Sequence, residues 1–249
     1  MMSERESEST ATRRTEYVDG EHDGLTGVGD QPGEETMTTF ATRFRQTTAA
    51  LLYLAVATTV VAAQPAASPK GMRALHEGMR KLWSDHVVWT RLYIVDAAAG
   101  SPSVNATTKR LLKNQEDIGN AIVPYYGTAA GSKLTDLLKQ HILIAADLVT
   151  SAKAGDQTKQ TDANKRWHDN AAELASFLSG ANPNWPKATL LTMLNEHLSL
   201  TTQEATARLQ QRWDDDIAAF DQVYMQAMMM ADALADGIAK QFPGKVNTN

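Results

Sequence analysis

The 249-residue chain has no cysteine. This excludes disulfide bonds, thiolate zinc sites, iron–sulfur clusters and covalently attached c-type haem. It also lacks a Gly-x-Ser-x-Gly elbow, a phosphate-binding glycine loop and a His-Glu-x-x-His helix. No segment shows the strict polar–apolar alternation of a half-buried strand. No catalytic residue can therefore be assigned from a motif, and no organic cofactor is indicated.

An excess of charge of either sign is missing from the greater part of the chain. Residues 1–63 contain 5 of the 24 basic side chains and 10 of the 29 acidic ones, so the remainder contains 19 of each. Nucleic acids and anionic membrane surfaces are bound chiefly through clustered positive charge. A balanced domain gives no reason to expect either partner, and we predict no nucleic-acid binding.

The N-terminal region has the composition of a leader followed by an export signal. Residues 1–36 are polar and acidic without periodicity, which predicts disorder. In residues 37–63, Arg43 and Arg45 precede an apolar run over 49–63 that ends in small residues. This pattern predicts a secretory signal peptide cleaved after Ala63, and hence a periplasmic or extracellular protein. The run is shorter than the about 20 residues of a membrane span. The alternative is an uncleaved membrane anchor over residues 47–63.

After a linker at 64–70, apolar residues recur in steps of three and four, interrupted by glycine and proline. The pattern predicts an all-α antiparallel bundle of five or six helices over 71–243, followed by a tail at 244–249. Pro124 is expected to end the second helix near Val123. Thr201 and Glu204 have capping-box spacing, which predicts that a new helix begins there. No internal repeat is evident. The expected helices cover 72–99, 105–123, 132–154, 162–178, 187–200 and 201–242.

Several polar residues occupy positions where the helical periodicity predicts burial. His86, His141 and His197 lie on the apolar stripes of three different helices. A buried imidazole or carboxylate costs several kcal/mol unless it is paired, so these positions require partners. Residues of the same kind on or beside the stripes are Asn114, Asp117, Asn170, Asp216 and Asp221.

Two hypotheses account for these polar residues. In the first, His86, His141 and His197 converge with Asp117 and Asp216 to bind a divalent metal ion, supported by Asn114, Asn170 and Asp221. The Glu-x-x-His pairs typical of di-iron bundles are absent, which weakens that particular version. In the second, the protein is a non-catalytic structural or interaction module. Each histidine then pairs locally and serves only the register of the helices.

Other features suggest further partners. Met225, Met228, Met229 and Met230 offer thioether ligands suited to copper, although consecutive residues point in different directions around a helix. The long apolar face of the last helix suggests a homodimer, unless the fifth helix covers that face. An interaction module would instead expose aromatic residues, for which Trp185 and Trp213 are the candidates.

Six segments form a recognisable series: LWSDHVVWTR (82–91), NQEDIGNAI (114–122), HILIAADLV (141–149), RWHDNAAELASFL (166–178), EHLSLTTQEA (196–205) and MADALADGIAKQFP (230–243). Together they resemble a bacterial family of small helical-bundle proteins of uncharacterised function. Members often carry automatic labels such as glycosyltransferase or acetylglutamate kinase. Both of those activities use α/β nucleotide-binding folds, and this chain shows no alternation of strands and helices. The resemblance implies an all-α fold and implies no catalytic residue.

Overall fold

The computed structural model describes residues 66–247, so the predicted leader and signal segment lie outside the described residues. Within 66–247 the chain forms helices and no strand, which confirms the all-α prediction for this part. No helix in this range combines the length and apolar character needed to cross a membrane. The helices are α1 (Pro69–Ala99), α2 (Val104–Tyr126), α3 (Thr128–Ala154), α4 (Gln157–Ala181), α5 (Lys187–Leu209), α6 (Trp213–Gln241) and α7 (Pro243–Val246).

Local sequence signals set several of the helix ends. The Ser68 hydroxyl accepts a hydrogen bond from the amide of Gly71 at the start of α1, and Asp156 accepts one from Lys159 at the start of α4. Gly100 and Gly155 end α1 and α3 in the left-handed conformation, which glycine adopts without steric strain. The glycine punctuation in the sequence therefore reports these ends correctly.

Several predicted helix boundaries differ from the structure. Helices α3 and α4 begin at Thr128 and Gln157, four and five residues before the predicted starts. Helix α5 continues through Thr201 to Leu209, and the break comes later, at Gln211, whose φ is 59°. Glu204 does not cap a helix there, because it is buried and pairs with Arg91. Similarly, α2 continues past Pro124 to Tyr126.

The C-terminal segment also differs from the predicted free tail. Pro243 begins the short helix α7, and Val246 is buried against Gly71 at the start of α1. Lys245 donates hydrogen bonds to the carbonyls of Pro124 and Tyr125, which satisfies the exposed end of α2. The bundle thus extends beyond residue 243.

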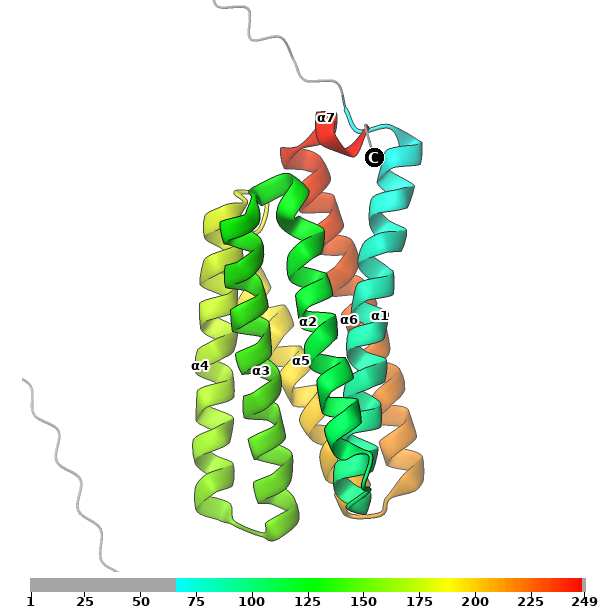
Figure 1. Ribbon diagram of the computed structural model, residues 1–249, viewed down its shortest axis with the longest axis vertical. Coiled ribbons are helices and arrows are strands. Elements are labelled where there is room, and N and C mark those ends of the chain that lie inside the picture. Colours follow the sequence, from blue (N-terminus) through cyan, green and yellow to red (C-terminus); the bar gives the residue numbers. More distant parts are fainter. Residues whose placement is uncertain (1–65, 248–249) are drawn as a thin grey trace, which may run out of the picture. The chain divides into compact units, whose positions relative to one another are not determined.

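Helices α1 to α6 form a closed ring in which each helix packs against the next and α6 returns to α1. Successive helices run in opposite directions (Figure 1). The odd-numbered helices α1, α3 and α5 also contact one another across the interior. Side chains on these three helices that point toward one another therefore share one central core.

The ring is built from three similar hairpins, α1–α2, α3–α4 and α5–α6, although no internal repeat is evident from the sequence. His86, His141 and His197 follow one another at intervals of 55 and 56 residues. In each hairpin the histidine is bonded to an amide side chain 29 residues later. Neighbouring layers repeat at the same spacing: Met79, Leu134 and Leu190, then Trp83, Leu138 and Leu194, are all buried.

The face of α6 that the sequence predicts to be buried is buried only in the C-terminal part of the helix. Ala227, Ala231, Leu234 and Ile238 are buried as expected, whereas Ile217, expected on the same face, is 56% exposed. Helices α1 and α5 pack against α6, so the face predicted to form a homodimer is largely covered within the chain itself.

Candidate functional site

The three predicted histidines are buried and lie at equivalent places in the three hairpins. His86, His141 and His197 come from α1, α3 and α5, the helices that meet in the interior. Each is no more than 4% exposed. We call these residues and their amide partners the histidine layer; the partners are Asn114, Gln115, Asn170 and Gln226.

In the second hairpin both ring nitrogens of the histidine are hydrogen-bonded. Trp167 Nε1 donates a 3.1 Å hydrogen bond to His141 Nε2, so the ring proton resides on Nδ1. His141 Nδ1 then donates to Asn170 Oδ1 at 2.9 Å, and Asn170 Nδ2 donates to the Leu137 carbonyl at 3.1 Å. Leu137 lies one turn before the histidine. One amide therefore connects both the ring and the backbone of the partner helix.

The third hairpin repeats this pattern with glutamine in place of asparagine. Gln226 Nε2 donates to the Met193 carbonyl at 2.8 Å, one turn before His197. The remaining amide oxygen of Gln226 lies 3.2 Å from His197 Nδ1 and accepts its proton. His197 therefore carries its proton on Nδ1, as His141 does.

In the first hairpin the bond to the backbone carbonyl and the bond to the histidine ring come from two neighbouring amide side chains. Asn114 Nδ2 donates to the Leu82 carbonyl at 3.1 Å, one turn before His86. Gln115 Nε2 lies 2.9 Å from the Leu111 carbonyl, 3.1 Å from Asn114 Oδ1 and 3.3 Å from His86 Nδ1. An amide nitrogen donates hydrogen bonds and does not accept them. His86 Nδ1 is thus an acceptor, and the His86 proton lies on Nε2.

Burial keeps all three rings neutral. Loss of hydration lowers the pKa of His141 to about 3 and that of His197 to about 4, and it lowers the pKa of His86 well below its usual 6.5. The mutual repulsion of the imidazolium forms acts in the same direction for His86 and His141. The centroids of the His86 and His197 rings are 5.6 Å apart. None of these rings is therefore poised to transfer a proton near neutral pH.

Not every polar atom near the histidine layer has a partner. Within residues 66–247 no hydrogen bond reaches Nε2 of His86 or Nε2 of His197. The buried Nε1 of Trp83, Oε1 of Gln115 and Oγ1 of Thr201 also have no partner in the described part of the chain. Buried polar groups in native proteins are usually paired, so a group of such atoms around one layer requires an explanation.

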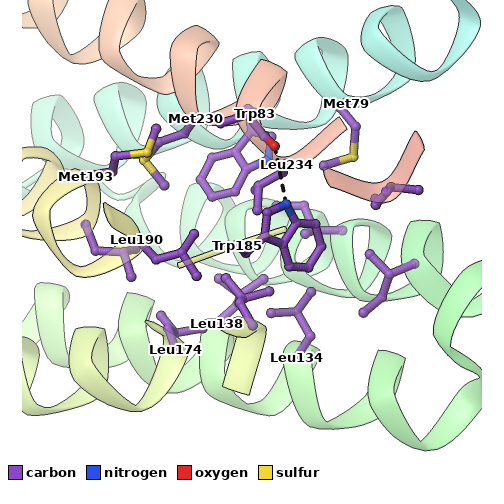
Figure 2. A pocket seen from close by; sticks show the side chains of 16 residues that line it. Met79, Trp83, Leu134, Leu138, Leu174, Trp185, Leu190, Met193, Met230 and Leu234 are labelled. Carbon is purple, nitrogen blue, oxygen red and sulfur yellow. Dashed lines mark hydrogen bonds between the residues drawn. The ribbon is translucent and has the colours of Figure 1, made fainter. Parts of the chain in front are cut away.

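Two small cavities flank the histidine layer, and each has a volume of about 40 Å³. The tryptophan cavity is lined by Trp83, Trp185 and apolar side chains of helices α1 to α6 (Figure 2). The threonine cavity is lined by Thr90, Thr201 and others. On α1 and α5 the histidine lies between a residue of one cavity and a residue of the other, so the histidine layer separates the two.

Trp185 fills the space beside the tryptophan cavity. It extends from the loop between α4 and α5 into the core and donates a 3.3 Å hydrogen bond to the Ala233 carbonyl (Figure 2). Gly237 permits this position, because a Cβ there would lie 1.9 Å from Trp185 Nε1. Trp185 is 5% exposed, so it is not the surface aromatic residue that the interaction hypothesis requires, whereas Trp213 is 50% exposed.

The acidic residues predicted as metal ligands do not join the histidines. Asp117 is partly exposed and pairs with Lys113, and Asp221 is exposed. Asp216 is buried, but both of its oxygens are bonded to arginine. Among residues 66–247 no three His, Cys, Asp or Glu side chains are placed to hold one metal ion. The predicted metal centre is therefore not assembled in the described structure.

Asp216 instead belongs to a buried ionic cluster with Arg91, Glu204 and Arg208. Arg91 donates to both Asp216 oxygens and, at 3.0 Å, to Glu204; Arg208 donates to Asp216 at 3.2 Å. Glu204 and Asp216 are each 1% exposed. Burial raises the pKa of Glu204 to about 7, because the bond from Arg91 offsets only part of the lost hydration. This cluster ties α1 to α5 and α6.

The methionine cluster is spread over several environments. Met225 and Met229 are 59% and 58% exposed, whereas Met230 is buried and lines the tryptophan cavity. Met228 packs against the core from a partly buried position. Met225 and Met229 are therefore on one exposed face, whereas Met228 and Met230 face the core.

The sequence interpretation missed several partners of the predicted residues. Gln115 and Gln226 complete the histidine layer, and Trp167 caps His141. The recurring interval from each histidine to an amide could have revealed the two glutamines. No comparable signal pointed to the pairing of Arg91 with Glu204.

Comparisons of the chain with protein-family models, with curated proteins and with solved structures gave no match. The resemblance to a family of small bacterial helical proteins therefore stays a prediction, and the function has to be argued from the geometry of the histidine layer.

Proposed function

We propose that this protein is a non-catalytic helical bundle, exported from the cytoplasm, that acts as a structural or interaction module. In this proposal the histidine layer fixes which helices pair and in which register. The observation that supports it is the threefold recurrence of one hydrogen-bonded unit. In each hairpin, a histidine and the carbonyl one turn before it are both bonded by amides of the partner helix.

The energetic argument concerns alternative registers. Apolar side chains tolerate a slip of one helix against another, because Leu and Ala pack acceptably in several positions. A slip of one turn moves an amide by about 5.4 Å and breaks both of its bonds. It would leave a buried imidazole and a buried carbonyl unpaired, at about 1–3 kcal/mol for each group. Three such units, one in each hairpin, select a single arrangement.

Metal binding by His86, His141 and His197 stays an alternative prediction. Against it, the Nδ1 atom of each ring is already bonded to an amide, and His141 Nε2 is occupied by Trp167. Copper binding through the methionines is a further alternative, for which Met225 and Met229 are the accessible sulfurs.

Elemental analysis separates the register proposal from the metal alternative. Protein purified without chelator should contain less than about a tenth of a metal ion per chain, and chelation should leave its melting temperature unchanged. His86→Gln should lower the melting temperature, and the exposed His168→Gln should not. One bound metal ion per chain that is lost in His86→Gln would overturn the proposal.

The interaction part of the proposal rests on apolar side chains left on the outer face of α6. Met225 and Met229 are each more than half exposed and lie one turn apart, so they share one face, and the exposed Ile217 lies about 80° from Met225 around the helix. We propose that this face mediates a homodimer in place of the buried face predicted from the sequence.

Export is proposed from residues 37–63, and N-terminal sequencing of protein from its native host tests it. A cytoplasmic protein that begins at Met1 or Met37 would contradict export.

A further inference from the structure

The walls of the tryptophan cavity come from helices α1 to α6 and from the loop that carries Trp185 (Figure 2). They include the thioethers of Met79, Met193 and Met230 and the indoles of Trp83 and Trp185, and the other lining residues are Leu, Ile or Ala. Thioethers are soft and polarizable, and they make favourable dispersion contacts with apolar atoms. These walls therefore suit an apolar occupant.

The indole nitrogens of the two tryptophans do not open into this space. Trp185 Nε1 donates a hydrogen bond to the Ala233 carbonyl, and Trp83 Nε1 is closed off by the atoms around it. A water molecule inside a cavity needs about two to four polar partners, and this apolar lining does not supply them. The threonine cavity has the same volume, but Gln160 and Thr206 are among its lining residues and can bind water. The tryptophan cavity is therefore the one that favours an apolar molecule over water.

Both indoles are held in place beside the cavity. Trp185 lies over Gly237, where a Cβ would come within 1.9 Å of its Nε1, and the centroid of the Tyr126 ring lies 5.8 Å from that of Trp185. Trp83 packs edge-on against His86, with ring centroids 5.6 Å apart. Neither indole can move into the cavity without loss of these contacts. The space is therefore preformed.

Size and charge narrow the chemical class of the ligand. The tryptophan cavity has a volume of about 40 Å³. A water molecule occupies roughly 30 Å³ in the liquid, and an engineered apolar cavity that binds benzene has roughly 150 Å³. The cavity therefore fits a molecule of about one or two heavy atoms and excludes an aromatic ring. Its lining residues carry no charge, so an ion would lose its hydration without compensation.

We propose that the tryptophan cavity binds one small apolar gas molecule of about the size of dioxygen. Transfer of such a molecule from water breaks no strong hydrogen bond and gains dispersion contacts with the walls. None of the residues that line the cavity belongs to the histidine layer. The proposal therefore goes beyond the proposed function, and the helices can keep their register whether or not a gas binds.

Xenon is the first probe, because it is a single apolar atom without a hydrogen-bonding group. Full-length protein labelled with ¹³C at the Met and Val methyl groups is titrated with xenon under pressure and followed by NMR spectroscopy. The methyl shifts of Met79 and Met230 should change and should saturate with xenon pressure. Val87 and Val223 are the controls, because each is 1% exposed and lines neither cavity, and their shifts should not saturate.

Dissolved dioxygen tests the proposed ligand itself, because it is paramagnetic and broadens the signals of methyl groups that it approaches. Without a binding site, the broadening should be greatest at Met225 and Met229, which are 59% and 58% exposed. With the proposed site, it should be greatest at Met79 and Met230 and should exceed that at the two control valines. Argon at the same pressure should broaden no signal.

Substitutions of Leu134 alter the volume of the cavity. Leu134→Phe places ring atoms in it and should abolish the saturable xenon shift, whereas Leu143→Phe, at an exposed position, should leave the shift unchanged. Leu134→Ala enlarges the cavity and should permit binding of cyclopropane, which the parent protein should exclude. If neither Leu134 variant folds, exclusion of cyclopropane by the parent protein decides the size class.

Three results would overturn the proposal. The first is a xenon shift at Met79 and Met230 that stays linear with pressure, or that still saturates in Leu134→Phe. The second is dioxygen broadening that simply follows the exposure of each methyl group. The third is saturable binding of cyclopropane by the parent protein.

Discussion

Acidification below pH 6.5 should destabilise this protein, because the three buried histidines must be neutral in the folded state. Their folded pKa values lie below the unfolded value of 6.5: about 3 for His141, about 4 for His197, and well lowered for His86. The unfolded chain therefore binds more protons than the folded one below pH 6.5. The stability that these groups contribute is fully present above pH 6.5 and is lost as the pH falls toward their folded pKa values.

The size of the effect follows from the linkage relation. At pH 5 each histidine is about 1.5 pH units below its unfolded pKa, which corresponds to about 2 kcal/mol, or about 6 kcal/mol for the three. Glu204 acts in the opposite direction. Its folded pKa is raised to about 7, so its contribution is lost as the pH rises from 4.5 to 7 and is regained on acidification. This offset is about 2 kcal/mol at pH 5, which leaves a net loss of about 4 kcal/mol.

Urea unfolding followed by circular dichroism at pH 7.5, 6.5, 5.5 and 5.0 measures this loss. A net change of about 4 kcal/mol is a large fraction of a typical stability of about 5–15 kcal/mol. His141→Gln retains donor and acceptor atoms without a titrating group, so its loss between pH 7.5 and 5 should be smaller by about 2 kcal/mol. Glu204→Gln removes the offset and should steepen the profile by a similar amount.

The control is His168→Gln, because His168 is exposed on α4 and should not alter the pH profile. If His141→Gln does not fold, His197→Gln tests the same point. A stability that is constant or increases between pH 7.5 and 5 would refute the reasoning. So would a slope that is unchanged when His141 or His197 is replaced.

Three further predictions concern packing, charge and assembly. Gly237→Ala should lower the free energy of unfolding by about 2 kcal/mol or more, because its Cβ would overlap Trp185. The control is Gly78→Ala, where a Cβ meets nothing within 4 Å, and it should be neutral or stabilising in thermal unfolding. Arg91→Ala should lower the free energy of unfolding by about 3–5 kcal/mol, since it leaves Glu204 and Asp216 buried with fewer partners. The control Arg80→Ala breaks only a surface pair with Asp232 and should cost about 1 kcal/mol or less. Similar losses in the two variants would contradict a stabilising role of the buried Arg91 pairs. Light scattering at micromolar concentration should show a dimer, and the double variant Met225→Lys with Met229→Lys should be a monomer. The control Leu143→Lys changes an exposed residue of α3 and should leave the dimer intact. A monomeric parent protein would exclude the dimer.

The sequence by itself determined the helical class, the C-terminal ends of α1 and α3, and the burial of the three histidines. These are properties of local order along the chain. Steps of three and four place His86, His141 and His197 on apolar faces, and Gly100 and Gly155 end helices because their conformation favours glycine. The capping-box interpretation at Thr201 failed because burial of Glu204 against Arg91 outweighs a local capping preference.

Only the tertiary structure decided which of those residues meet. Periodicity assigns a side chain to a face of its own helix but says nothing about the direction of that face relative to other helices. Asp216 therefore looked available to a metal ion until the fold placed it against Arg91 and Arg208. In the same way, the closed ring brought the centroids of the His86 and His197 rings within 5.6 Å of each other.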